Sequence, residues 1–198
     1  MKSRNSIVLI IILGILLIAG CGGCNAYNSL VKTDQGVKKA WSNVETNYQR
    51  RTDLYNSVIK TIEGSANFEK STLREVLEAR SKATSVNVNL DDPKSLQAYQ
   101  QAQASLQTSM GRLLAVVENY PDLKTTKAFQ DFQAQIEGTE NRINVARRDF
   151  NAEVERYNLL VKTFPQNIFA GIFRFKEKPY YEADPGTNRP PNINFNIK

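Results

Sequence analysis

Apolar residues recur at alternating intervals of three and four residues along most of the chain, which is the spacing of helices that bury one face. The first such seam runs for 26 residues and is interrupted only by Arg51. It comprises Val37, Trp41, Val44, Tyr48, Arg51, Tyr55, Val58 and Ile62. We therefore expect a long amphipathic helix that ends at the helix breaker Gly64.

Two further helices are expected between residues 67 and 120. The shorter one extends from about Asn67, a residue suited to the N-cap position, to Val86. Asp92 directly precedes Pro93, and this pair typically starts a helix after a loop. Pro121 then disfavours helical geometry in the residue before it, so this third helix ends near residue 120. Its seam comprises Leu96, Tyr99, Gln103, Leu106, Met110, Leu113, Val117 and Tyr120.

A fourth helix is expected from about Asp122 to the helix-stopping Pro165. Its seam comprises Phe129, Phe132, Ile136, Thr139, Ile143, Ala146, Phe150, Glu153, Tyr157, Leu160 and Phe164. Short connections make successive helices pack side by side, so we predict an all-α fold, an antiparallel four-helix bundle with long helices. Arg51 and Glu153 occupy seam positions that are otherwise apolar, and they either pair within the core or lie at its wet end.

Three asparagines recur every seven residues along the last helix, at Asn144, Asn151 and Asn158. This spacing places them on one stripe of the helix surface. Such a stripe either fixes the register of a neighbouring segment through hydrogen bonds or faces water. Because most polar side chains are exposed, we expect the stripe to face solvent.

An uncharged leader precedes the bundle. Lys2 and Arg4 come before a dense apolar stretch of 13 residues, Ile7–Ala19, and no further charge occurs until Lys32. The dense stretch is shorter than the roughly 20 residues that cross a bilayer, whereas the uncharged stretch through Tyr27 reaches that length. The leader is therefore either an uncleaved transmembrane helix or the signal of an exported protein. Lys2 and Arg4 favour an N-terminus in the cytoplasm and hence a bundle outside it, whereas Lys32, Lys38 and Lys39 on the other flank oppose that orientation. The side of the membrane that holds the bundle therefore stays open.

A second interpretation of the leader comes from Ile18–Cys21, which resembles a bacterial lipobox. In that case Cys21 would be the lipid attachment site after cleavage. The alternative is that Cys21 and Cys24 are small apolar residues at the end of a helix. In either case we expect residues 1–26 to be a membrane anchor.

The composition limits the chemistry of the bundle. The chain of 198 residues contains no histidine, and its only two cysteines lie in the leader. Zinc, haem and iron–sulfur ligand sets, and nucleophile pairs that need histidine, therefore cannot be assembled in the bundle. We expect no catalytic residue, no metal and no cofactor, and hence no enzyme. An enzyme would need acids such as Asp53, Glu140 or Glu153 to converge in one cleft. The net charge of +6 is scattered, which is typical of a solvated exterior rather than a nucleic-acid surface.

Several short motifs occur in order over residues 27–183. The motifs are Tyr27–Val31, Ala40–Val44, Gln49–Leu54, Glu78–Ala83, Glu118–Leu123, Glu140–Ile143, Ala146–Asn151, Tyr157–Asn158 and Phe164–Pro165. In this unbroken order they resemble the motifs of the LemA family, and one departure is Tyr55–Ser57, where the family usually has Ile-Pro-Asn. The resemblance implies a bacterial membrane-anchored helical bundle, held in the cytoplasm, and it supplies no catalytic residues.

These observations predict a membrane-tethered, non-enzymatic interaction or scaffold protein of the bacterial cell envelope, with the membrane and an unidentified protein as partners. The alternative is a sensor or binding bundle whose core accepts an apolar or peptide ligand. Within the bundle region, residues 27–183, the aromatic extension 165–183 must be covered, so it folds back over the bundle or meets a partner or the lipid interface. The proline-containing residues 184–198 are expected to form a flexible tail.

Overall fold

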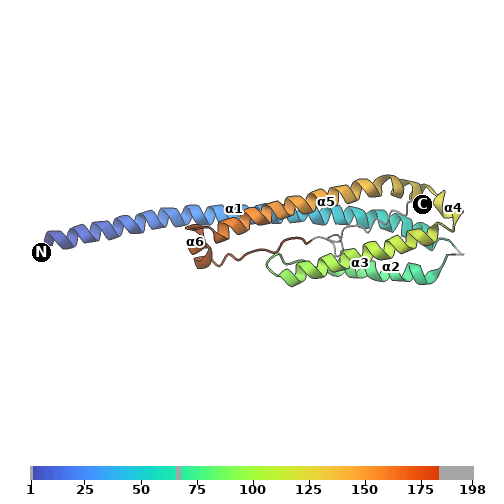
Figure 1. Ribbon diagram of the computed structural model, residues 1–198, viewed down its shortest axis with the longest axis horizontal. Helices are drawn as coiled ribbons and strands as arrows, with labels where there is room; N and C mark the ends of the chain where they lie inside the picture. Colours follow the sequence, from blue (N-terminus) through green and yellow to red (C-terminus); the bar gives the residue numbers. More distant parts are fainter. Residues whose placement is uncertain (1, 66–67, 183–198) are drawn as a thin grey trace, which may run out of the picture.

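The computed structural model describes residues 2–65 and 68–182, and for residues 2–21 it describes the backbone alone. These parts of the chain are helical, with no strand among them, which confirms the all-α prediction (Figure 1). The helices are α1 (Lys2–Glu63), α2 (Lys70–Ser85), α3 (Pro93–Val117), α4 (Pro121–Lys124), α5 (Lys127–Lys162) and α6 (Gln166–Ile172).

The long helices pack as two antiparallel pairs, α1 with α5 and α2 with α3 (Figure 1). In the first pair Arg51 contacts Glu140, whereas the earlier residue Gly36 lies against the later Glu153. The α2–α3 pair covers the half of α1 that lies farther from the N-terminus (Figure 1). The helix α6 lies beyond the end of the α2–α3 pair that is nearer to the N-terminus (Figure 1). The part of α1 nearest the N-terminus therefore extends past all the other helices.

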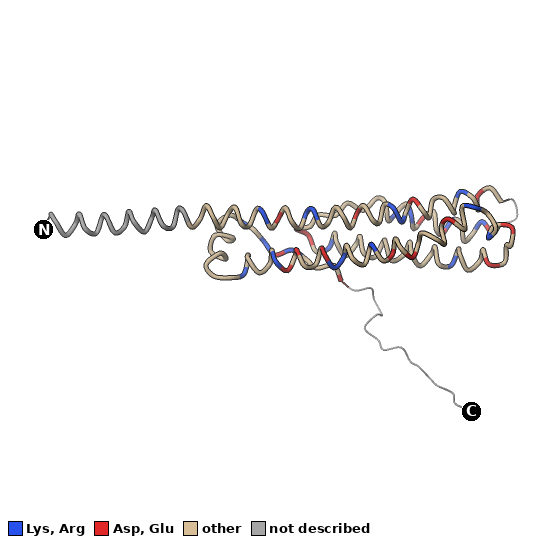
Figure 2. The backbone as a smooth tube through the Cα atoms, turned by 90° about the horizontal axis from the view of Figure 1, so that it is seen from above, with Lys and Arg blue, Asp and Glu red and all other residues tan. Residues whose placement is uncertain are grey.

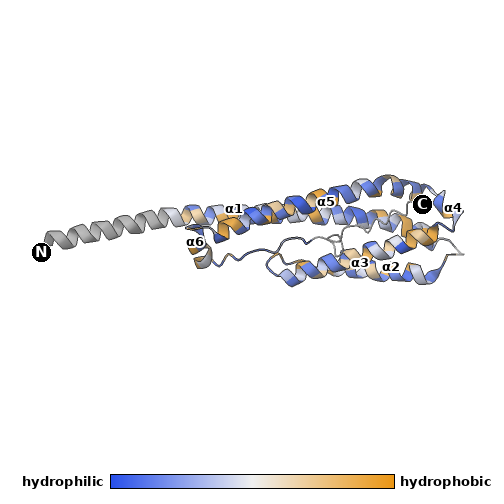
Figure 3. Ribbon diagram, viewed as in Figure 1, coloured by the Kyte–Doolittle hydropathy of each residue, from blue (hydrophilic) through white to orange (hydrophobic). Residues whose placement is uncertain are grey.

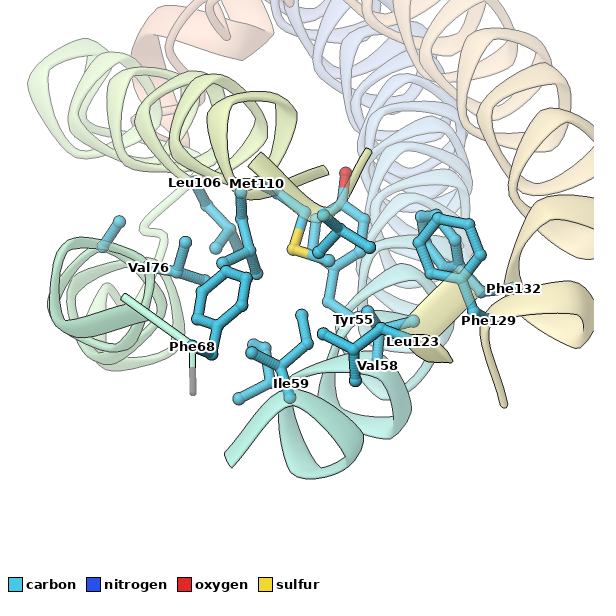
Figure 4. Close-up of a cluster of buried hydrophobic side chains, with 14 of the residues drawn as sticks. Tyr55, Val58, Ile59, Phe68, Val76, Leu106, Met110, Leu123, Phe129 and Phe132 are labelled. Atoms are coloured by element: carbon cyan, nitrogen blue, oxygen red, sulfur yellow. The ribbon is translucent and has the colours of Figure 1, made fainter. Parts of the chain in front are cut away.

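Two hydrophobic clusters hold these helices together. The distal cluster joins the end of α1 to α2, α3, α4 and the start of α5 (Figure 4). Its buried members include Tyr55, Val58, Ile59, Ile62, Phe68, Val76, Ala79, Ala83, Leu106, Met110, Leu113, Val117, Leu123, Phe129 and Phe132. The proximal cluster joins the middle of α1 to α5 and the start of α3, and it includes Val37, Ala40, Trp41, Val44, Tyr48, Leu96, Tyr99, Ile143, Ala146, Phe150, Val154, Tyr157 and Tyr181. All eight positions of the first predicted seam are buried.

Local capping explains where the helix boundaries agree with the prediction and where they differ. The side chain of Asp92 accepts a hydrogen bond from the Lys94 amide at 3.0 Å, so α3 begins as predicted. The predicted second helix begins instead at Lys70, after Glu69, while Asn67 lies outside the described residues. The predicted fourth helix is divided into α4 and α5, because Thr126 caps a new helix start by accepting from the Phe129 amide at 3.4 Å.

The end of the fourth seam also differs from the prediction. Val154 is fully buried in place of Glu153, since an α-helix of 3.6 residues per turn drifts away from a strict seven-residue repeat. Phe164 lies beyond the end of α5 and is 75% exposed. The seam therefore wrongly placed Phe164 in the core, whereas the half-buried Glu153 lies at the edge of the core, one of its two expected places.

The leader and the tail lie largely outside the described residues. The backbone of α1 is continuous from Lys2 to Glu63, but the side chains of residues 1–21, including Cys21, and the whole tail 184–198 are not described. Over residues 22–65 and 68–182, no helix combines the length and the apolar character that crossing a membrane requires. The membrane anchor of residues 1–26 therefore stays a prediction.

Candidate functional site

An extended segment after α6, residues 174–182, runs back along the α1–α5 pair, and we call it the strap (Figure 1). The chain reverses at Arg174, whose φ of 61° is a left-handed conformation suited to a sharp turn. The Phe175 amide then donates to the Ala170 carbonyl at 2.9 Å. The strap part of the aromatic extension thus folds back over the α1–α5 pair, as one of the expected alternatives had it, whereas Ile168, Ile172 and Phe173 stay exposed.

Two asparagines of α5 hold the backbone of the strap. Asn158 donates from Nδ2 to the Lys178 carbonyl and accepts from the Lys178 amide, both at 2.9 Å. Asn151 makes the same pair of bonds with Tyr181, at 2.9 and 2.8 Å. Seven helical residues rise about 10.5 Å, and three extended residues span about 10 Å, so the two spacings match. The expectation that the stripe faces solvent was wrong for these two residues, whereas Asn144 is exposed.

Lys178 joins the strap to two other parts of the fold. Its side chain is 2% exposed, and Nζ lies 2.9 Å from Asp34 Oδ1 on α1 and 2.7 Å from Asp91 Oδ1 in the α2–α3 loop. Burial opposes the positive charge, but hydrogen bonds with Asp91 and Asp34 outweigh it and raise the pKa of Lys178. Burial likewise opposes the negative charge of Asp34, but hydrogen bonds from Lys38 and Lys178 hold its pKa below the ordinary value. The ion pairs are therefore favoured over neutral forms.

A tyrosine pair fixes the far end of the strap to the proximal cluster. The hydroxyl oxygens of Tyr48 and Tyr181 lie 2.6 Å apart, and Arg147 donates from Nε to the Tyr48 hydroxyl at 2.9 Å. The Arg147 guanidinium also lies over the Tyr181 ring, 4.6 Å from its centroid. The strap is thus bound by backbone pairing, by ion pairs and by aromatic packing.

Arg51 is fully buried between the proximal and distal clusters. Its Nη2 donates to Gln103 Oε1 at 2.8 Å, and Nη1 lies 3.5 Å from Glu140 Oε1. Its guanidinium lies 4.6 Å from the Tyr48 ring centroid and 5.7 Å from that of Tyr55. Burial raises the pKa of Tyr55 to about 12 although the Arg51 charge opposes this, so the ring stays neutral. Arg51 therefore links α1 to α3 and α5.

The two charged seam residues do not pair with each other. Glu153 accepts from Arg156 Nη1 at 2.8 Å, whereas Arg51 uses Gln103 and Glu140. Of the two expected outcomes, Arg51 lies in the core and Glu153 at its edge.

The acids that an enzyme would require lie apart. Asp53 is exposed and accepts from Gln49 Nε2 at 3.0 Å. Glu140 and Glu153 are separated by thirteen residues of α5, about 20 Å along its axis. In the described part of the chain no group of three or more acidic or cysteine side chains is placed to hold a metal ion.

Three hollows occur on the surface of the α1–α5 pair, and one of them, of about 710 Å³, is lined by polar residues such as Asn47, Asn141 and Arg148. The remaining two differ in character. One is a groove of about 880 Å³ whose lining mixes both signs of charge, including Lys32, Lys39, Asp149 and Arg156. The other, of about 510 Å³, lies where α6 meets α1 and is mostly apolar. It is lined by Gly23, Cys24, Tyr27, Asn28, Phe169, Ile172 and Phe173.

Comparison with known proteins agrees with the motifs in the sequence. A model described as the LemA family matches residues 40–195, which is most of the chain. The chain belongs to the LemA family. The family model begins after Asp34, so one of the two partners of Lys178 lies outside it.

Individual relatives of this LemA-family chain are distant. It is 26% identical over 183 residues to magnetosome protein MamQ 2 of Paramagnetospirillum magneticum and 24% identical over the same length to MamQ of Magnetospirillum gryphiswaldense. Each alignment covers 83% of this chain and 67% of the relative. Protein LemA of Metamycoplasma hominis is 27% identical over 143 residues, which are 72% of this chain and 63% of that protein.

Sequence reasoning missed the residues that bind the strap. Lys178, Asp34 and Asp91 appeared in the sequence as scattered surface charges. The seven-residue spacing of Asn151 and Asn158 was the available signal. An extended segment that follows the last long helix is the natural partner of such a stripe.

Proposed function

We propose that this LemA-family chain is a membrane-tethered, non-enzymatic interaction or scaffold protein of the bacterial cell envelope. The observation that supports it is the continuity of α1. One helix carries both the uncharged leader and the seam from Val37 to Ile62, which is buried against α3 and α5. A membrane that receives the leader then holds the packed helices at a fixed distance and in a fixed direction.

In this proposal the two antiparallel helix pairs act as a single four-helix bundle. Side chains of α1, α2, α3 and α5 meet in the distal cluster, and Arg51 ties α1 to α3 and α5. The separation of Asp53, Glu140 and Glu153 supports a non-catalytic role.

The anchor is tested by intact mass of the membrane-extracted protein together with alkylation of Cys21 and Cys24. The full-length mass with two alkylatable thiols identifies an uncleaved span. Loss of residues 1–20 with added acyl mass identifies a lipid on Cys21. A chain recovered in the soluble fraction without any extraction would contradict the tether itself.

The scaffold role is tested by mild cross-linking in intact cells followed by purification of the chain. A stoichiometric envelope protein should be recovered, and its yield should fall when charges in the α1–α5 groove, such as Lys39 and Arg156, are reversed. Charge reversal at Arg112, which lies on α3 outside the groove lining and pairs with Glu75, is the matched control. Equal yields from both variants would remove the groove from the proposal.

The second candidate, a binding bundle for a peptide or apolar ligand, is favoured by Asn151 and Asn158. Each asparagine makes these hydrogen bonds with backbone atoms of the strap, so the two asparagines can bind an extended peptide with little dependence on its sequence. A labelled peptide of residues 174–182 should then bind the intact protein and exchange with the strap. Binding that is unchanged in Asn158→Ala would argue against this candidate.

A further inference from the structure

Exposed apolar side chains gather at the end of the bundle from which the leader departs. Five of the eight large hydrophobic residues that are exposed in the described chain lie there, and we call them the apolar collar. Figure 3 shows hydrophobic residues in α6 and in the neighbouring part of α1. The collar comprises Tyr27 at 43%, Phe164 at 75%, Ile168 at 52%, Ile172 at 65% and Phe173 at 43% exposed.

The helix α6 is apolar on both of its sides. Ala170 is buried against the bundle, while Ile168 and Ile172 face outward. Apart from Gln166 and Asn167 at its start, α6 carries no polar side chain, and a helix that is apolar on opposite sides normally lies within a protein core or a membrane. Exposure of the outer side of α6, with Ile168 and Ile172, to water alone is therefore unfavourable.

This end of the bundle has no charged residues in its described part, and the charged residues that border it are basic. Residues 22–31 and 163–173 contain no charge, and the described end of the bundle carries no charged segment (Figure 2). The first charged residues that flank these two stretches on the bundle side are Lys32, Lys162 and Arg174. An apolar belt bordered by basic residues matches the boundary between acyl chains and phosphate headgroups.

The position of α6 along α1 agrees with this boundary. A Cβ atom on Gly23 would lie 3.1 Å from Phe169 Cε1, and the rings of Tyr27 and Phe173 are 5.0 Å apart. The uncharged stretch of α1, Asn5–Val31, contains 27 residues and rises about 40 Å, close to the full thickness of a bilayer with its headgroups. A hydrocarbon core of about 30 Å that starts at Ile7 ends near residue 26, at the level of α6.

We propose that α6 and the apolar collar lie in the interface of the lipid bilayer, beside the point where α1 leaves it. The inference rests on the proposed membrane anchoring, and it holds for both forms of the anchor, because Cys21 is only two residues from Gly23. The apolar hollow between α6 and α1 faces the acyl chains and takes up their upper segments. The collar thereby fixes the bundle against the membrane surface rather than leaving it on a free stalk.

The test places a tryptophan in the collar of the full-length chain. Ile172→Trp is reconstituted into vesicles of phosphatidylcholine and phosphatidylglycerol, with and without brominated acyl chains that quench nearby tryptophan. Its fluorescence should fall at least about twofold with brominated lipid, since an interfacial side chain lies within several ångströms of the acyl chains. Ile168→Trp is a second reporter, and Val145→Trp, exposed on α5 away from α6, is the matched control. The native Trp41 is 5% exposed and supplies the background in the unmodified chain.

The outcomes separate the collar from the anchor. Equal quenching of Ile172→Trp, Ile168→Trp and Val145→Trp, in protein that stays with the vesicles after alkaline carbonate treatment, would overturn the collar and leave the anchor intact. Protein that does not stay with the vesicles would overturn the anchoring on which the collar rests.

Discussion

Asn158 on α5 pairs with the backbone of Lys178, its side-chain amide donating to the carbonyl and accepting from the amide group, both at 2.9 Å. The two residues are 20 positions apart in the sequence, and both are buried. The pairing satisfies backbone groups that would otherwise be left without partners away from water. It also brings the Lys178 side chain to Asp34 and Asp91. The strap is therefore an integral part of the fold.

Asn158→Ala should destabilise the protein and release the strap. The substitution leaves a buried amide and carbonyl of Lys178 unpaired, which costs about 2 to 3 kcal/mol in the free energy of unfolding. Urea denaturation should show a lower midpoint, and hydrogen exchange at the amides of Lys178 and Tyr181 should accelerate. Asn144→Ala, on the same stripe but exposed, is the control and should change stability by less than about 0.5 kcal/mol. Equal midpoints for the two variants would contradict the pairing.

Lys178→Met should cost more stability than the same change at Lys162. Lys178 is 2% exposed and bonds two carboxylates, whereas Lys162 pairs with Glu177 at the surface, with side chains 60% and 53% exposed. Loss of charge-assisted bonds at the buried site should lower the free energy of unfolding by about 1 to 3 kcal/mol. The exposed ion pair is screened by solvent, so its loss should change stability far less. Chemical denaturation of both variants at one pH makes the comparison.

The stability difference between wild type and Lys178→Met should depend on pH in a defined way. The pKa of Asp34 is lowered from 3.8, so its contribution is present above that value and is lost as pH falls through the folded-state pKa. The pKa of Lys178 is raised from 10.5, so its contribution is present below that value and is lost as pH rises beyond it. The difference should therefore be constant from about pH 5 to about pH 9 and should shrink outside that range. A difference that does not shrink on either side of this range would show that the ion pair is not its source.

Gln103→Leu should be strongly destabilising, and Arg51→Met should partly relieve it. Gln103 supplies the shortest acceptor to the buried guanidinium of Arg51, at 2.8 Å. Its loss leaves a buried charge under-paired, at a cost of about 3 kcal/mol. The double variant removes that charge, so its destabilisation should fall short of the sum of the two single changes by about 1 to 2 kcal/mol. Strict additivity in urea denaturation would mean that the two side chains do not interact.

Gly23→Leu should detach α6 from α1, whereas Gly22→Leu should not. A Cβ atom at residue 23 would meet the Phe169 ring at 3.1 Å, while one at residue 22 would meet nothing within 4 Å. Leucine otherwise improves helix propensity over glycine by roughly 0.8 kcal/mol at either position. Hydrogen exchange over residues 166–172 should accelerate in Gly23→Leu alone. Equal protection in both variants would contradict the close packing of α6 on α1.

The sequence alone determined most of the helical segments and buried faces, although it missed the break between α4 and α5 and the end of the last seam. Each seam is a local repeat, and burial of one helix side requires that repeat whichever partner covers it. For the same reason Asp92 and Pro93 located the start of α3 correctly. The missing histidines and the position of both cysteines also followed from the sequence alone, because composition does not depend on packing.

Only the tertiary structure decided what covers the α1–α5 pair and where Asn151, Asn158, Lys178 and Arg51 find their partners. The strap is extended and has no periodic pattern, and its main bonds use backbone atoms, which carry no sequence signal. The ion pairs of Lys178 join residues 87 or more positions apart, so no local spacing could indicate them. Charged side chains look alike in a sequence whether they face water or a buried partner. The surrounding fold makes that choice, since a charge is buried only where its partners are already held in place.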